Sequence, residues 1–399
     1  MTKKKIIIFT STGGNGHMSV THALIEMLQE TYDVVSVLAF RDVLGSIDPF
    51  LKCTKKKWSG EDFYNYCLKK KWINAIHILV MLRTIYYWLN KNKIITLIRA
   101  YLVKHKPDMI ISVIPFINGE IYYNATQLNI PFLIIPTDMD ASTFMFNVKK
   151  SMYTKFIIAE PFDAPELLNS IPKQFRKNLV VTGLPIRRNF FISKDRDKIQ
   201  VAWSLPDNKK IILIMMGGQG SHSALLFAQG LADLDMPAHL LICIGNYTEL
   251  ENQLKKIIFQ KHITYTVVKF THKMADLMAV ADIIITKSGS VSFYEALYVG
   301  KPIILDATSP ILSWEQLNHV LVKKYKLGDI VYSVQDIRYM IEEIFKNHSS
   351  YTECVANIKK LINKNNLEPN AIKRLIDMFI MEGDYLTSNK LSLEMSKQR

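Results

Sequence analysis

Three glycine-rich turns follow directly on short apolar runs, and this feature limits what the chain can fold into more than any other. The turns are STGGNGH at residues 11–17, GGQGSH at 217–222 and TKSGSV at 286–291. An apolar run of five or six residues predicts a buried strand, and the periodicity after each turn predicts a helix. The chain is therefore predicted to be an α/β protein with glycine turns at strand-to-helix junctions.

The same alternation runs through both halves of the sequence. With 399 residues the chain is too long for one ordinary core. Repeated strand–helix–strand units place strands in parallel sheets covered by helices on both faces. We expect two Rossmann-like domains whose sheets face each other across a cleft. Their predicted bounds are 1–190 and 191–381, followed by a polar, flexible tail at 382–399.

Composition narrows the class of protein and of partner. Apolar residues make up 49% of the chain and charged residues 22%, as in globular proteins. The four cysteines show no CxxC spacing, which favours a reducing compartment over a disulfide framework or a zinc site. A net charge of +14 indicates an anionic partner or simply a lysine-rich composition. No apolar run is long enough to cross a membrane.

The turn at 286–291 predicts an anion site. Backbone N–H groups at the start of a helix and the helix dipole attract phosphate, and Lys287 adds a cation or is merely solvated. Glu295, six residues after Gly289, is placed to bind the hydroxyls of a ribose. A single glycine turn is more often a plain turn than a phosphate site. Three such turns in one chain favour a nucleotide.

Six phrases resemble one family. Gly13–His17, Pro136–Asp138, Val181–Arg187, Met216–Gly220, Thr286–Glu295 and Trp314–Asn318 resemble motifs of the family 28 glycosyltransferases of the GT-B fold. The nearest subgroup is that of monogalactosyldiacylglycerol synthase and the bacterial diacylglycerol glucosyltransferases. The resemblance implies an inverting, metal-independent enzyme that moves a hexose from a UDP-sugar to a lipid such as diacylglycerol. It implies no cofactor besides the UDP-sugar co-substrate.

The resemblance also assigns residues. Gly13, Gly14 and Gly16 would form a loop on the acceptor side. The donor would be bound by Arg187, Gly218, Gln219, Gly220, Phe270, Lys287, Gly289, Ser290, Val291, Glu295, Glu315, Gln316 and Asn318. The chain has Ser288 where the family usually has proline, and its sugar segment departs from the galactolipid pattern. The identity of the sugar therefore stays open, and for Phe270 a place in the core is nearly as plausible as contact with the base.

Two residues are candidates for the general base. Asp138 ends an apolar run, and partial burial would raise its pKa; the resemblance implies that it is the likelier base. His17 lies at a helix start, where the dipole keeps it neutral, and is an aligner or a second-choice base. The structural alternatives are a helix cap for Asp138 and a local hydrogen bond for His17. Asp138 and Asp140 also form an acid-x-acid pattern, but it is far in sequence from the diphosphate turns, and we predict no metal site.

Residues 55–104 interleave lysines with tryptophans and tyrosines, which suits an anionic lipid surface. The alternative is a pair of ordinary helices whose aromatic side chains pack inward. We expect a cytoplasmic protein that sits peripherally on the membrane. Competing functions are a UDP-N-acetylglucosamine transferase acting on a polyprenyl- or lipopolysaccharide-type lipid, and a UDP-sugar 2-epimerase. A regulatory or nucleic-acid binder is disfavoured, since no nucleic-acid motif is present, and no nucleic-acid partner is predicted.

Overall fold

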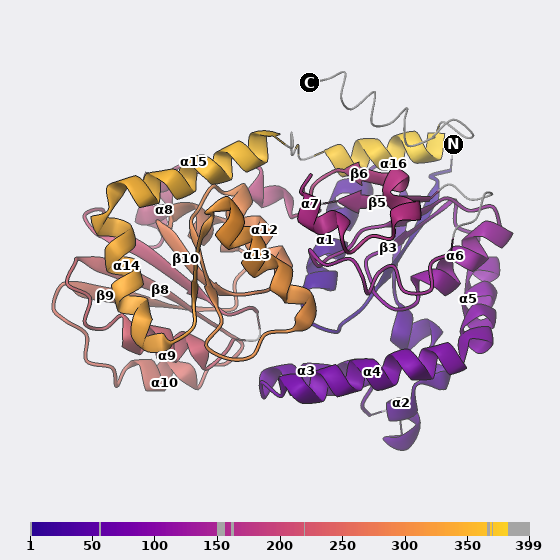
Figure 1. Ribbon diagram of the computed structural model, residues 1–399, viewed down its shortest axis with the longest axis horizontal. Coiled ribbons are helices and arrows are strands. Elements are labelled where there is room, and N and C mark those ends of the chain that lie inside the picture. The colour runs from indigo at the N-terminus through magenta and orange to yellow at the C-terminus, as the bar shows by residue number, and fades with distance from the viewer. Residues whose placement is uncertain are drawn as a thin grey trace. The chain divides into compact units, whose positions relative to one another are not determined.

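The computed structural model describes residues 2–55, 57–149, 156–160, 163–218, 220–364, 368 and 370–381 (Figure 1). It divides into two compact units. Unit 1 comprises residues 1–188 and 367–399, and unit 2 comprises residues 189–366. The division falls after Arg188, close to the boundary predicted between residues 190 and 191. The tail predicted at 382–399 lies outside the described residues.

Unit 1 is built on a parallel sheet of six strands in the order β2-β1-β3-β4-β5-β6. The first strand is buried from Ile6 to Phe9, as a strand covered on both faces must be. The strands are β1 (Lys5–Thr10), β2 (Asp33–Leu38), β3 (Met109–Ser112), β4 (Phe132–Ile134), β5 (Phe156–Glu160) and β6 (Leu179–Val181).

Helices cover this sheet, and one comes from the far end of the chain. They are α1 (Gly16–Leu28), α2 (Pro49–Cys53), α3 (Gly60–Lys69), α4 (Ile73–Leu89), α5 (Lys91–His105), α6 (Asn118–Gln127), α7 (Pro165–Leu168) and α16 (Ala371–Met381). The sequence prediction put α16 in the second domain, whereas it groups with unit 1. Its Leu375 and Phe379 are buried, and Tyr32 Oη donates a hydrogen bond to Asp377 at 2.6 Å.

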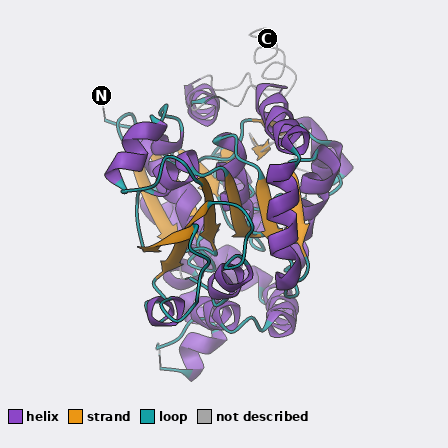
Figure 2. Cartoon of the chain, turned by 90° about the vertical axis from the view of Figure 1, so that its left-hand side faces the viewer, coloured by secondary structure: helices purple, strands orange, loops and turns teal. Residues whose placement is uncertain are grey.

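Unit 2 repeats the plan with a parallel sheet in the order β12-β11-β10-β7-β8-β9. Helices lie on both sides of its strands (Figure 2). The strands are β7 (Lys210–Met215), β8 (Ala238–Gly245), β9 (Ile263–Lys269), β10 (Ile283–Lys287), β11 (Ile303–Asp306) and β12 (Gly328–Val331). The helices are α8 (Arg196–Ala202), α9 (Ser223–Gly230), α10 (Leu250–Leu254), α11 (Met274–Val280), α12 (Ser290–Tyr298), α13 (Gln316–Tyr325), α14 (Ile337–Lys346) and α15 (His348–Lys364).

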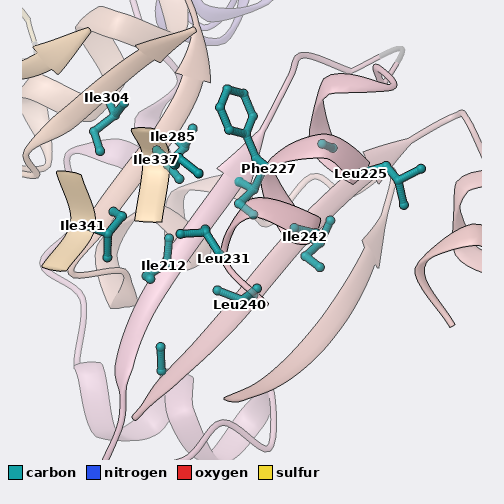
Figure 3. Packing of buried hydrophobic residues seen from close by; sticks show 14 of the residues in the cluster. Ile212, Leu225, Phe227, Leu231, Leu240, Ile242, Ile285, Ile304, Ile337 and Ile341 are labelled. Atoms are coloured by element: carbon teal, nitrogen blue, oxygen red, sulfur yellow. The ribbon is translucent and has the colours of Figure 1, made fainter. Parts of the chain in front are cut away.

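One apolar cluster holds β7 and β8 against α9 and α14. Ile212 and Ile242 project from the strands, Phe227 from α9 and Ile337 from α14, and all four are fully buried (Figure 3). Because the strands are apolar on both faces, the polar residues that follow them gather at the carboxyl edge of the sheet. The fold thereby confirms the predicted α/β class with two parallel sheets.

Each sheet has one point where the strand order reverses. In unit 1 it lies between β1 and β3, and in unit 2 between β7 and β10. In open parallel sheets ligands bind outside the carboxyl ends of the strands at this point, since the loops on either side diverge there. All three glycine turns stand next to a reversal: residues 11–16 after β1, 217–222 after β7 and 288–291 after β10.

Candidate functional site

The reversal point of unit 1 holds His17, in the first turn of α1. Its Nδ1 lies 2.7 Å from the carbonyl oxygen of Val113, which follows β3. A carbonyl can only accept, so Nδ1 carries the proton and Nε2 keeps its lone pair. Thr137 Oγ1 lies 2.9 Å from the same Nδ1. His17 is thus fixed in the tautomer that can accept a proton at Nε2.

The surroundings of His17 keep the ring neutral. Burial lowers the pKa of His17 to about 4, and the charge of Arg83 on α4 acts in the same direction. The hydrogen bond to Val113 acts the other way without reversing the shift. The hydrogen bonds that orient the ring are not the local one predicted as the structural alternative, because Val113 and Thr137 are far from His17 in sequence.

Asp138 directly follows Thr137, the residue that contacts His17, and its side chain is half-buried. The structure thus brings the two candidate bases to one unit, His17 at the start of α1 and Asp138 in the turn after β4. Arg187 is half-buried and belongs to the same unit, beyond β6 and the left-handed Gly183 (φ +75°). The roles predicted for these three residues stay predictions.

The turn that carries Gly13, Gly14 and Gly16 is held by protein groups. Glu61 of α3 accepts hydrogen bonds from Ser11 Oγ and from the Thr12 N–H at 2.8 Å. The Gly14 N–H donates to Asn65 Oδ1 at 2.8 Å. Two loop amides are thereby occupied, and a buried carboxylate stands beside them. This turn is built to hold a loop shape, and its acidic neighbour disfavours phosphate.

The turn after β7 is compressed against the end of β8. Gly220 has a φ of +74°, and a Cβ there would lie 2.1 Å from the carbonyl oxygen of Ile244. A Cβ on Gly245 would lie 2.4 Å from the oxygen of Gly218. Both positions therefore require glycine, because any side chain would push the two loops apart. Gly218 and Gly220 lie here as predicted from the sequence, and Gln219 lies outside the described residues.

Lys287 connects the turns after β7 and β10. Its Cε is 3.4 Å from where a Cβ of Gly217 would stand and 3.1 Å from the corresponding position on Gly289. Glu315 Oε1 lies 3.7 Å from that same position on Gly289. Burial raises the pKa of Glu315, and the Lys287 charge opposes the rise. Predicted donor residues from two segments, Lys287 from the end of β10 and Glu315 from the residue before α13, therefore lie next to Gly289.

The segment 288–290 is held from behind by α13. Asn318 is fully buried, and its Nδ2 donates to the Ser288 carbonyl at 2.6 Å and to Ser290 Oγ at 3.1 Å. The side chain predicted to read the sugar thus supports the loop, while Gln316 is exposed. His319, for which the sequence predicts no role, lies with its Nε2 2.6 Å from Ser288 Oγ. The only sequence feature that could have pointed to His319 is Ser288, which stands where the family usually has proline.

The remaining donor candidates differ in exposure. Val291 is buried in the first turn of α12, and Glu295 one turn later is 4% exposed. Phe270 follows β9, is 55% exposed and meets the His272 ring edge-on at 5.2 Å between ring centres. The core alternative for Phe270 is therefore wrong. Its exposed face is free of the core and can stack on a planar base.

Helix α4 carries an apolar stripe on its outside. Ile78, Leu82, Ile85, Trp88 and Leu89 are each roughly half exposed or more and recur at helical spacing. Other aromatic side chains of this region do pack inward, such as Tyr87, which stacks on Phe40. Some aromatic side chains thus pack inward as the alternative expects, while the contact of the exposed ones with a lipid surface stays a prediction. We call the exposed side chains of residues 60–89, which comprise α3, α4 and the link between them, the α3–α4 surface.

None of the described helices combines the length and the apolar composition that a bilayer span requires. In the part of the chain that the structure describes, no three His, Cys, Asp or Glu side chains gather in a way that could hold a metal ion.

Comparison with known proteins identifies the chemistry. Residues 211–375 match the glycosyltransferase family 28 C-terminal domain. A processive diacylglycerol beta-glucosyltransferase of Bacillus licheniformis is 25% identical over 383 residues, covering 92% of this chain and 93% of that protein. The Bacillus subtilis protein of the same name is 23% identical and is covered completely.

Solved structures show the same architecture. The crystal structure of Acinetobacter baumannii MurG superposes with a TM-score of 0.61 at 17% identity, covering 94% of this chain and 99% of that one. Arabidopsis thaliana UGT89C1, complexed with UDP-L-rhamnose, gives 0.60 at 13% identity, covering 95% and 99%. The predicted GT-B fold is confirmed, as are the resemblance to family 28 and the assignment as a sugar-transferring enzyme.

Proposed function

We propose that this chain, whose residues 211–375 belong to glycosyltransferase family 28, transfers a hexose from a UDP-sugar to a lipid hydroxyl. Diacylglycerol is the acceptor we favour, because curated relatives matched over nearly their whole length carry that lipid in their name. This end-to-end match is the observation that carries the proposal.

The donor would be bound in unit 2. Helix α12 begins at Ser290 directly after Gly289. The first N–H groups of any α-helix have no acceptor within the helix, so they point toward this turn. Lys287 lies over the same glycine. Together they supply positive charge for a diphosphate without calling on a metal ion. Phe270 is available for the uracil, and Glu295 is proposed for the ribose.

The acceptor would be activated in unit 1. The lipid hydroxyl oxygen attacks C1 of the sugar, the C1–O bond to the diphosphate breaks, and UDP leaves with the bond electrons. The hydroxyl proton passes to a base, for which His17 Nε2 and the Asp138 carboxylate are the two groups proposed. A single displacement inverts C1, so an α-linked UDP-hexose yields the β-linked product named in the relatives.

The lipid would be met through the α3–α4 surface. Exposed Trp72 and Trp88 suit the headgroup region, and Lys69, Lys70 and Lys71 adjoin Trp72. Each lysine near an anionic surface adds about 1 kcal/mol to binding. We therefore place the enzyme peripherally on the cytoplasmic face of a membrane.

The test is a panel of UDP-sugars offered with phosphatidylglycerol vesicles that contain diacylglycerol, with mass spectrometry of the lipids. We expect a hexosyl-diacylglycerol from one or two donors. A product formed only on a polyprenyl phosphate lipid, from UDP-N-acetylglucosamine, would replace the proposed acceptor. Release of a 2-epimer without any glycolipid would identify an epimerase and contradict transfer altogether.

A further inference from the structure

Helix α3 holds the turn before His17 through two side chains one helical turn apart. Glu61 is buried, and its Oε1 accepts from both Ser11 Oγ and the Thr12 N–H. A residue four positions on lies on the same side of the helix. That residue is Asn65, and it contacts the same turn.

Asn65 makes two hydrogen bonds of opposite polarity. Its Oδ1 accepts from the Gly14 N–H at 2.8 Å, and its Nδ2 donates to the Thr12 carbonyl at 2.8 Å. An amide is required, since neither a carboxylate nor a hydrocarbon offers a donor and an acceptor in these positions. Tyr64 adds packing, with its Cδ1 3.7 Å from where a Cβ of Gly13 would stand.

The start of α3 is itself fixed. Ser59 and Asp62 form a reciprocal capping box, and Asp48 Oδ2 accepts from the Gly60 N–H at 3.0 Å. The helix therefore offers Glu61 and Asn65 from a rigid base. The turn that they hold leads within three residues from Gly14 to His17.

We propose that Glu61 and Asn65 are positioning residues, which fix the 11–14 turn and thereby the placement of His17. The inference rests on the proposed function, because it assigns these residues to the transfer step. Misplacing a reacting group by about 1 Å can cost about 100-fold in rate. The two hydrogen bonds of Asn65 span the two residues on either side of Gly13, so their loss frees the turn.

The variants separate hydrogen bonding from size and charge. Asn65→Ala removes both bonds, and Asn65→Asp keeps the shape but sets an oxygen against the Thr12 carbonyl. Glu61→Met removes the acceptor at similar length, whereas Glu61→Gln keeps one acceptor oxygen. In Glu61→Gln the amide NH2 takes the place of Oε2, which has no hydrogen-bond partner among the described residues. Asn92→Ala, at an exposed site on α5, is the matched control.

We expect Asn65→Ala, Asn65→Asp and Glu61→Met to lower kcat about 10- to 100-fold, with the Kd for UDP changed less than about twofold. Glu61→Gln and Asn92→Ala should stay within about threefold of the wild type. In a His17→Ala background, Asn65→Ala should cost less than about threefold more, because the group it positions is gone. Equal losses with and without His17 would overturn the proposal.

A second measurement does not depend on activity. The ring-nitrogen NMR shifts of His17 should report a proton on Nδ1 in the wild type and a mixture of tautomers in Asn65→Ala. If the protein transfers no sugar to any lipid, the proposed function fails, yet this signal still tests the positioning. Unchanged His17 shifts in Asn65→Ala would overturn the inference even in an active enzyme.

Discussion

The glycine turns of the two units arise from the same kind of sequence and end in opposite electrostatic settings. In unit 1 the turn at 11–14 gives its amides to Glu61 and Asn65, and a buried carboxylate stands beside it. In unit 2 Lys287 lies over Gly217 and Gly289, and α12 begins at the second of these turns. A glycine turn after a buried strand therefore predicts a tight strand-to-helix junction. The charged side chains beside the turn determine whether it can bind an anion.

The difference between the two turns also predicts a separate function for each unit. In unit 1 the Glu61 and Asn65 side chains already occupy the amides that an anion would need, whereas in unit 2 Lys287 and a helix start favour an anion, even with Glu315 nearby. Unit 1 instead presents a neutral imidazole whose acceptor nitrogen is fixed. Substitutions in unit 1 should consequently change turnover, and substitutions in unit 2 should change donor binding.

The largest effect is expected from the two candidate bases. His17→Ala and Asp138→Asn should each be tested for kcat on lipid vesicles, and the true base should lose about 100- to 10,000-fold. Calorimetry should give a Kd for UDP within about twofold of the wild type for both variants. The larger loss identifies the base. Near-normal turnover in both would break the assignment of catalysis to unit 1.

Reversing the charge in unit 2 should weaken the donor instead. Lys287→Glu is expected to raise the Kd for UDP about 10- to 100-fold, since a hydrogen bond to a charged group contributes about 1.5–3 kcal/mol. Lys287→Arg should keep most of the affinity. Lys324→Glu, an exposed site on α13, is the control for overall charge. Equal losses of UDP affinity in Lys287→Glu and Lys324→Glu would show that Lys287 does not contact the diphosphate.

The two units also differ in their expected binding to membranes, which we assign to the α3–α4 surface of unit 1. Trp88 is 62% exposed in unit 1, and Tyr339 on α14 is 66% exposed in unit 2. Trp88→Asp should lower partitioning to phosphatidylglycerol vesicles about tenfold, because an inserted aromatic side chain contributes about 1.5–3 kcal/mol. Tyr339→Asp should have little effect. A sedimentation assay in which both variants bind as the wild type does would remove this surface from the account.

The smallest effect we expect is that of pH, since the protonation state of His17 should change little around neutral pH. Burial lowers the pKa of His17 to about 4, from 6.5 in an unfolded chain. The folded protein thus takes up this proton only near pH 4, so any contribution of neutral His17 persists through neutral pH and is lost as the pH falls toward 4. Titration of the His17 ring by NMR should show that midpoint. A midpoint near 6.5 would mean that the ring is neither buried nor held as described.

The fold could be predicted from the sequence because its strands are short, apolar and regularly spaced. β1, β7 and β10 lie where the apolar runs predict them, since strands buried on both faces have little alternation to obscure them. α16 was assigned to the wrong side of the division. Its attachment through Tyr32 and Asp377 joins residues 345 positions apart, and no local pattern reports such a contact.

The site was less accessible to sequence reasoning. Lys287, Gly289 and Glu315 converge as the family motifs suggested, but Asn318 supports a loop where a sugar contact was expected. Glu61 and Asn65 were missed entirely. They look like ordinary polar residues of an amphipathic helix, and their value comes from a turn some 50 positions earlier in the chain.

The most direct measurement is calorimetric titration of the folded protein with UDP and, in parallel, with uridine. The account predicts saturable binding of UDP well below about 1 mM and binding of uridine at least about tenfold weaker, because the diphosphate provides the contact to the unit 2 turns. Failure of UDP to bind at that concentration, or equal affinity for uridine, would contradict the claim that these turns hold a diphosphate.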